Sequence, residues 1–116
     1  MTSVDAARDF LQREGRIVER RLFAVLLDGA SPGPVVDAVR AHRNDDGGFG
    51  HAMEPDKRVP ASQPLDVEHA LETLDAASAW DDGLAAGACD FLASIAAPDG
   101  SVPLLLPSAL EFPQSP

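Results

Sequence analysis

Apolar side chains recur at steps of three and four residues along much of the chain, which is the spacing of amphipathic helices. Four such stretches can be placed, at about residues 3–27, 32–43, 62–77 and 83–96. Gly15 interrupts the first stretch, and a glycine inside a helix costs about 1 kcal/mol relative to alanine. The pattern there predicts either one helix or two.

Residues that favour helix ends flank these stretches. Thr2 or Ser3 can cap the first, and Gly29 suits the left-handed position that closes it. Ser31 and Ser62 each stand close before a proline, which is tolerated in the first turn of a helix. These signals support the placement of the first three stretches.

The fourth stretch, which Asp81 or Asp82 can cap, is apolar on nearly every side. Such a pattern predicts a helix that is buried on most sides. Cys89 lies inside this stretch and is expected to be a small buried side chain. Because it is the sole cysteine, no internal disulfide framework is expected.

The pattern changes after Gly100, where four prolines fall within the last fourteen residues. This density of proline predicts that no helix persists there. The same segment is strongly apolar at five positions, Leu104, Leu105, Leu106, Leu110 and Phe112. It should therefore pack against the helices, a partner or a continuation of the chain.

Composition agrees with a helical fold. Of 116 residues, 45% are hydrophobic, but only five Phe and one Trp are aromatic. A core of alanine and leucine suits close-packed helices better than packed strands. We predict an all-α fold of about four helices, with residues 1–102 as a helical domain and 103–116 as a proline-rich tail.

The charge is large and unevenly distributed. The formal net charge is −10, all nine Lys and Arg lie at or before Arg58, and nine acids follow it. An acidic half of this kind repels phosphate backbones, so nucleic-acid binding is not expected. The chain has no signal-peptide pattern and no apolar run long enough for a membrane span, so a cytoplasmic location is expected.

An internal repeat appears when the chain is shifted by 53 residues, so that VVDAVRAHRNDDGGFG aligns with ACDFLASIAAPDGSVP. Each copy is a short helix, an Asp-Gly turn and an inward apolar residue. A repeat of about this length is typical of stacked helix pairs. We interpret the shared positions as a structural turn, formed by Asp46, Gly47, Gly48, Phe49 and Gly50 and, in the second copy, by Asp99 and Gly100.

The sequence DGGFG, followed by HAMEPD and SQPLDVEHALETLD, resembles the repeat of the prenyltransferase and squalene-cyclase family. In that family a helix ends in a turn of the type Gln-x-x-Asp-Gly-Gly/Ser-Phe/Trp-Gly. The resemblance covers about residues 34–103. It implies helical hairpins that form part of an α/α toroid, and an isoprenoid or other apolar ligand.

Several features of that family are missing. Arg43 stands nearest to the position of the upstream glutamine, and the acid motif Asp-x-Asp-Asp does not occur. The zinc ligands of protein prenyltransferases do not map, because Cys89-Asp90 has the wrong order and spacing. The chain is also too short to close a toroid, so it is a partial or degenerate member by this resemblance.

The most chemically promising stretch is the polar loop that follows the first turn. It carries His51, Glu54 and Asp56, with Asp66 and His69 on the next helix. These side chains could bind a divalent metal or, in Asp66 and His69, form an acid–base pair. The alternative is a polar loop whose carboxylates pair with nearby Lys and Arg side chains, and we assign no metal and no cofactor.

Two functions follow. The first is a toroid-like helical repeat module that binds or supports a partner without catalysis, and whose open ends favour self-association or completion by further repeats. The second is a fragment or subunit of a terpenoid-cyclase-like or prenyltransferase-like enzyme with an isoprenoid substrate.

Overall fold

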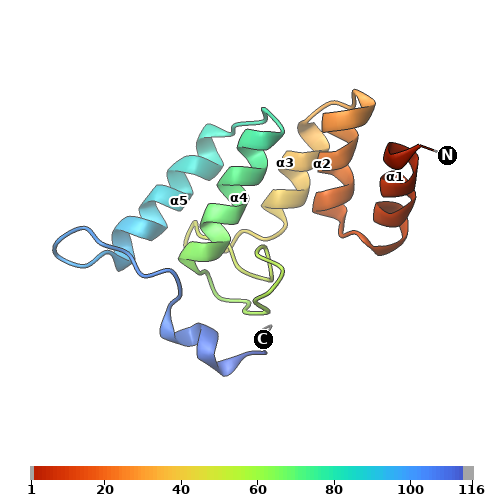
Figure 1. Cartoon of the computed structure of the whole chain (residues 1–116). Coiled ribbons are helices and arrows are strands. Elements are labelled where there is room, and N and C mark those ends of the chain that lie inside the picture. The colour runs from red at the N-terminus through yellow and green to blue at the C-terminus, as the bar shows by residue number, and fades with distance from the viewer. Residues whose placement is uncertain (1, 114–116) are drawn as a thin grey trace.

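The computed structural model describes residues 2–113. Within that part of the chain the protein is all-α, as predicted, and its helices lie side by side in one row (Figure 1). The elements are α1 (Ser3–Glu14), α2 (Ile17–Asp28), α3 (Gly33–Arg40), α4 (Pro64–Ala76), α5 (Asp82–Ile95) and the 3-10 helix η1 (Pro107–Glu111).

The row is open and elongated. The molecule measures 54 × 33 × 22 Å, and its radius of gyration is 15.3 Å. A compact domain of similar length has a radius of gyration of about 13 Å. The helices α1 and α5 form the two ends of the row (Figure 1).

The first predicted stretch is two helices, because the chain bends at Gly15 and Arg16. Gly15 adopts extended backbone angles, and a side chain there would place its Cβ 2.7 Å from the carbonyl oxygen of Leu11. Arg16 is also extended and is the N-cap of α2. Thr2 caps α1 in a capping box with Asp5, which decides between the two predicted caps.

The core lies between α2, α3, α4 and α5, and α1 contributes no buried residue. Small and aliphatic side chains dominate it, as the composition predicts. The clustered buried residues are Val18, Val35, Ala38, Val39, Phe49, Met53, Val67, Ala70, Leu74, Ala77, Ala79, Leu84, Ala88 and Phe91.

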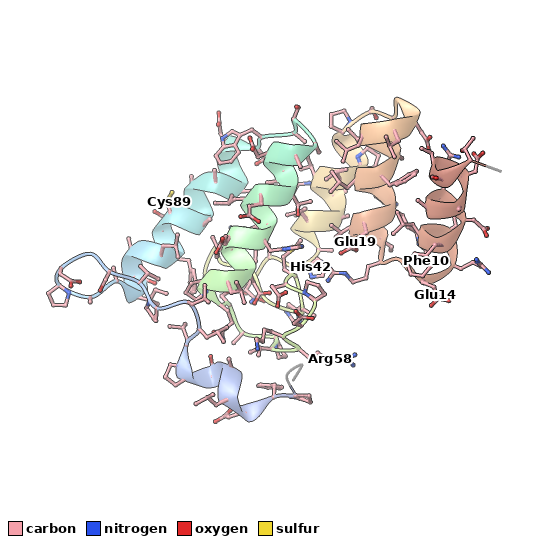
Figure 2. The ribbon with its side chains drawn as sticks, in the orientation of Figure 1. Phe10, Glu14, Glu19, His42, Arg58 and Cys89 are labelled. Carbon is pink, nitrogen blue, oxygen red and sulfur yellow. The ribbon has the colours of Figure 1, made fainter. Side chains whose placement is uncertain are left out.

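The helix α5 is less buried than its sequence predicts, and this part of the sequence reading was wrong. Only Leu84, Ala88 and Phe91 are buried, along one face. Cys89 is exposed on the outer side of α5 (Figure 2). No further helix follows α5 in the described row, so its apolar outer face has no neighbour to cover it. Asp81 caps the helix by accepting a hydrogen bond from the backbone amide of Leu84.

The proline-rich segment folds back onto the start of α4. The side chain of Gln63, which is fully buried, accepts a hydrogen bond from the amide of Leu106 and donates one to the hydroxyl of Ser108. Contrary to the sequence prediction, the segment contains η1, which begins at Pro107 in the first-turn position that tolerates proline. Phe112 is partly exposed, and Pro116 lies outside the described residues.

The loop between α3 and α4, residues 41–63, lies below the lower ends of these two helices (Figure 1). Among the described residues there is no strand, and one isolated antiparallel bridge pairs Arg43 with Phe49. The described helices also include none with the length and apolar character that a membrane crossing requires.

Candidate functional site

The first Asp-Gly turn is closed by a short network of hydrogen bonds. The amide of Asn44 donates to the carbonyl of Gly48 at 2.9 Å, and the amide of Gly47 donates to the carbonyl of Asn44 at 3.0 Å. Asp46 Oδ1 accepts from the amide of Gly48 at 2.9 Å and from the hydroxyl of Ser62 at 2.7 Å. Asp46 therefore joins the turn to the residues before α4.

The second turn repeats this geometry. The amide of Ala97 donates to the carbonyl of Ser101 at 2.9 Å, and the amide of Gly100 donates to the carbonyl of Ala97 at 2.8 Å. Asp99 Oδ1 accepts from the amide of Ser101 at 2.9 Å. Gly47 and Gly100 share a φ of +86°, a backbone conformation that favours glycine. The sequence repeat is thus also a repeat of backbone structure.

The surroundings of the two turns differ. A side chain at Gly47 would place its Cβ 2.3 Å from the carbonyl oxygen of Gly87, so the first turn packs directly on α5. Phe49 next to it is fully buried. At Gly100 an added Cβ would meet nothing within 4 Å, and Val102 is 37% exposed. The first turn is covered by a helix of the next repeat, and the second is not.

The loop after the first turn begins with two residues in the left-handed backbone region, His51 (φ 51°) and Ala52 (φ 59°). Non-glycine residues adopt this conformation at a cost of about 1–2 kcal/mol each. Hydrogen bonds on both sides hold it, because the His51 amide donates to the Val59 carbonyl and the Gly50 amide donates to the His42 carbonyl.

The groups around His51 also determine which of its ring nitrogens carries the hydrogen. Asn44 Nδ2 lies 2.9 Å from the carbonyl oxygen of Pro60, which can only accept, so Asn44 Oδ1 faces His51 Nε2. His51 Nε2 must then carry the hydrogen. By the same reasoning, His42 Nδ1 donates to the carbonyl of His51 at 2.9 Å.

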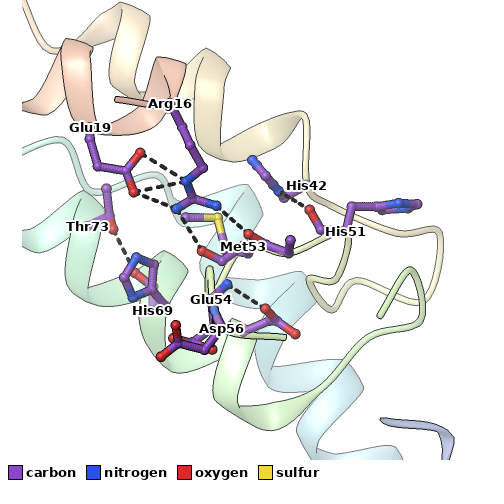
Figure 3. A network of polar contacts seen from close by, with 11 residues as sticks. Arg16, Glu19, His42, His51, Met53, Glu54, Asp56, His69 and Thr73 are labelled. Atoms are coloured by element: carbon purple, nitrogen blue, oxygen red, sulfur yellow. Dashed lines mark hydrogen bonds and ion pairs between the residues drawn. The ribbon is translucent and has the colours of Figure 1, made fainter. Parts of the chain in front are cut away.

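Arg16 fastens this loop to the helices (Figure 3). Its guanidinium donates to the carbonyls of Ala52 and Met53, and it forms an ion pair with Glu19 at 2.6 Å. Burial is the largest single influence on the pKa of Glu19 and raises it. The hydrogen bonds and charge of Arg16, a backbone hydrogen bond and the charge of His69 together outweigh burial, so the pKa lies below its usual value. Both side chains therefore carry a charge, and the two charges cancel within the pair.

Asp66 holds the loop by a hydrogen bond from α4. It is fully buried on α4, and its Oδ1 accepts a hydrogen bond of 2.6 Å from the amide of Glu54. Its Oδ2 is buried without a hydrogen-bond partner. Burial is the main cause that raises the pKa of Asp66 to about 6, against the opposing effect of the Glu54 amide.

The predicted polar residues gather only in part. Asp66 is joined to the backbone of Glu54, and the Glu54 carboxylate accepts from the amide of Asp56. No hydrogen bond joins Asp66 to His69 among the described residues. Instead, the carbonyl of His69 accepts from the Thr73 hydroxyl, and the His69 ring lies near enough to Glu19 to lower its pKa (Figure 3).

The arrangement gives little support to a metal site. Within residues 2–113, no three His, Cys, Asp or Glu side chains are grouped so that they could hold an ion. The sequence reading missed Arg16, Asn44 and Gln63, which organise the loop and the segment after α5. Their contacts with Ala52, Pro60 and Ser108 span 36, 16 and 45 residues, so no local pattern indicates these roles.

Two open hollows flank His51. The larger, of about 490 Å³, is lined by Arg16, His51, Ala52, Pro55, Arg58 and Pro60. The smaller, of about 420 Å³, is lined by Asn44, Asp45, Asp46, His51, Pro60, Ala61 and Ser62. One is thus bordered by cationic side chains and the other by two aspartates.

Comparison with protein-family models, curated proteins and solved structures gives no match for this chain. What the protein does must therefore be inferred from its own residues. The site offers a preformed loop, a buried carboxyl group with a raised pKa, and a cationic hollow of the size that small-molecule sites usually have.

Proposed function

We propose that this protein is a toroid-like helical repeat module that binds a ligand or partner and does not catalyse a reaction by itself. The duplicated Asp-Gly turn is the observation that carries the proposal. The two copies agree in backbone geometry, and the first copy is covered by a helix of the following repeat. Units of this kind stack on one another in repeat proteins.

The uncovered second turn supports association at this end of the row. Gly100 has open space where Gly47 meets α5, and Val102 is partly exposed where Phe49 is buried. A second copy of the chain, or a further repeat, would cover this turn as α5 covers the first. We propose self-association through this end.

The polar loop supports binding rather than catalysis. Asp46 is committed to the turn and to Ser62, and one oxygen of Asp66 is committed to the amide of Glu54. Strained backbone held by several side chains is typical of functional loops. We therefore propose the hollow beside His51 and Arg58 as the ligand site of the module.

A fragment-binding experiment tests this function. In amide NMR spectra of the whole chain, a mixed set of small acidic, basic and neutral fragments should shift signals of residues around the larger hollow. Signals of α1, which contributes nothing to the hollow, serve as the internal control. The proposal fails if no fragment shifts these signals, or if the protein alone turns over a ligand that binds there.

Asp66 is the observation that favours the second candidate, an isoprenoid-handling enzyme or its fragment. A carboxyl group with a pKa of about 6 can act as a proton donor near neutral pH. The test is incubation with farnesyl or geranylgeranyl diphosphate and magnesium, with Asp66→Asn as control. Turnover that depends on Asp66 would support this enzyme, and the absence of both turnover and a thermal shift would exclude it.

A further inference from the structure

We propose that the larger hollow binds a small molecule through an oxyanion, a carboxylate or phosphate group that Arg58 receives. The inference rests on the proposed ligand site and adds its chemical class. The chain has 19 acidic residues and a net charge of −10, yet no carboxylate lines this hollow. A concave surface that presents a cation without a carboxylate partner, here Arg58, attracts anions locally.

Arg58 is the anchor. It lies on the loop below the helices (Figure 2), is exposed, and makes no hydrogen bond or ion pair within the described part of the chain. Most other arginines are occupied by carboxylates or carbonyls, namely Arg8, Arg13, Arg16, Arg20 and Arg40. A guanidinium with free donors matches the two oxygens of a carboxylate or phosphate in a bidentate contact.

Arg16 has a different part, which is to preform the hollow. Glu19 neutralises its charge, and its donors already hold the carbonyls of Ala52 and Met53. It therefore fixes the wall of the hollow that carries Ala52 without adding net charge. A site that is ordered before binding loses less entropy when the ligand enters.

His51 supplies a second polar contact. Because its Nε2 hydrogen faces Asn44, its Nδ1 is the ring nitrogen left for a ligand. On the other side of His51, Asp45 and Asp46 border the smaller hollow and repel an anion from it.

The experiment is a titration of the whole chain with phenyl phosphate, benzoate and inorganic phosphate, followed by calorimetry and amide NMR. At least one of the three should bind and shift signals around the hollow. Comparison of phenyl phosphate with benzoate tells which oxyanion is preferred. Arg58→Gln should weaken binding by about tenfold or more.

Arg21→Gln is the matched control, since Arg21 is also an exposed arginine but does not line the hollow. Equal weakening by both variants would mean general attraction and would overturn the inference. If neutral fragments bind in the hollow while all three anions fail, the ligand class is wrong and the binding module stands. If nothing binds there, both proposals fail.

Discussion

Asp46 and Asp66 use the same functional group in opposite surroundings. Asp46 receives two hydrogen bonds on one oxygen at the edge of the fold, whereas Asp66 is fully buried and leaves one oxygen without a partner. An unpaired buried oxygen costs free energy, and a buried charge costs more. Asp66 therefore contributes to the geometry of the loop at the expense of stability at neutral pH.

The first prediction follows from the raised pKa of Asp66. Since the folded state holds this proton up to about pH 6 and the unfolded state only to about its ordinary value of 3.8, lowering the pH from 7 to 4 stabilises the fold through this group. The difference between the pKa of Asp66 in the folded and unfolded states corresponds to a change in the free energy of unfolding of about 3 kcal/mol at most. Asp66→Asn, which keeps the acceptor for Glu54, should raise the free energy of unfolding by about 1–3 kcal/mol at neutral pH.

Urea unfolding of Asp66→Asn and the parent chain at several pH values measures this effect. The gain should shrink toward zero as the pH falls from 7 to 4. Asp99→Asn is the control, because hydrogen bonds from Ser101 lower the pKa of exposed Asp99 and no gain is expected there. A difference between Asp66→Asn and the parent that does not change with pH would contradict the prediction.

At the scale of elements, the two turns form a natural comparison. Asp46→Ala removes hydrogen bonds to Gly48 and Ser62 in a turn that packs against α5, so it should lower the free energy of unfolding by about 1–3 kcal/mol. Asp99→Ala removes hydrogen bonding to Ser101 that is exposed to solvent, so the loss should be about 0.5 kcal/mol or less. Urea midpoints at equal slope measure both. Equal losses would mean that the covering helix adds nothing to the turn.

The helices also show which structural features can be predicted from the sequence. The steps of three and four residues locate α3, α4 and α5 to within a few residues, because each helix buries one continuous stripe. The number of sides that a helix buries depends on its neighbours. The prediction that Cys89 is buried on α5 was therefore wrong. Whether the chain breaks at Gly15 was left open from the sequence, and the next residue, Arg16, makes its contacts with Ala52 and Met53 far along the chain.

The candidate site was predictable only as a list of polar residues. His51, Glu54 and Asp66 were identified from the sequence, but their arrangement depends on contacts over long separations. Nothing in the sequence near His51 indicates that it adopts a left-handed conformation, because glycine is the residue that usually marks one. The cationic hollow joins Arg16 to residues more than 30 positions away, so no motif contains it.

At the scale of the whole molecule, the open row and the acidic charge act against each other. The uncovered turn after α5 offers apolar surface, with Val102 37% exposed, next to an outer helix face that carries Cys89. The second half of the chain has nine acids and no base, so two copies repel each other when they approach through this end. Salt screens such repulsion, with a Debye length of about 10 Å at 0.1 M and about 3 Å at 1 M.

Association of the chain with itself should therefore increase with ionic strength. Sedimentation velocity over a series of concentrations should find mainly monomer at low salt and a growing fraction of dimer or larger species at high salt. Val102→Glu should abolish the increase, because it adds charge beside the open turn. Val4→Glu is the matched control, since Val4 is 41% exposed but lies on α1 at the other end of the row. If the chain remains monomeric at all salt concentrations, self-association through the second turn is contradicted. Equal effects of Val102→Glu and Val4→Glu would mean that the two copies associate through another surface.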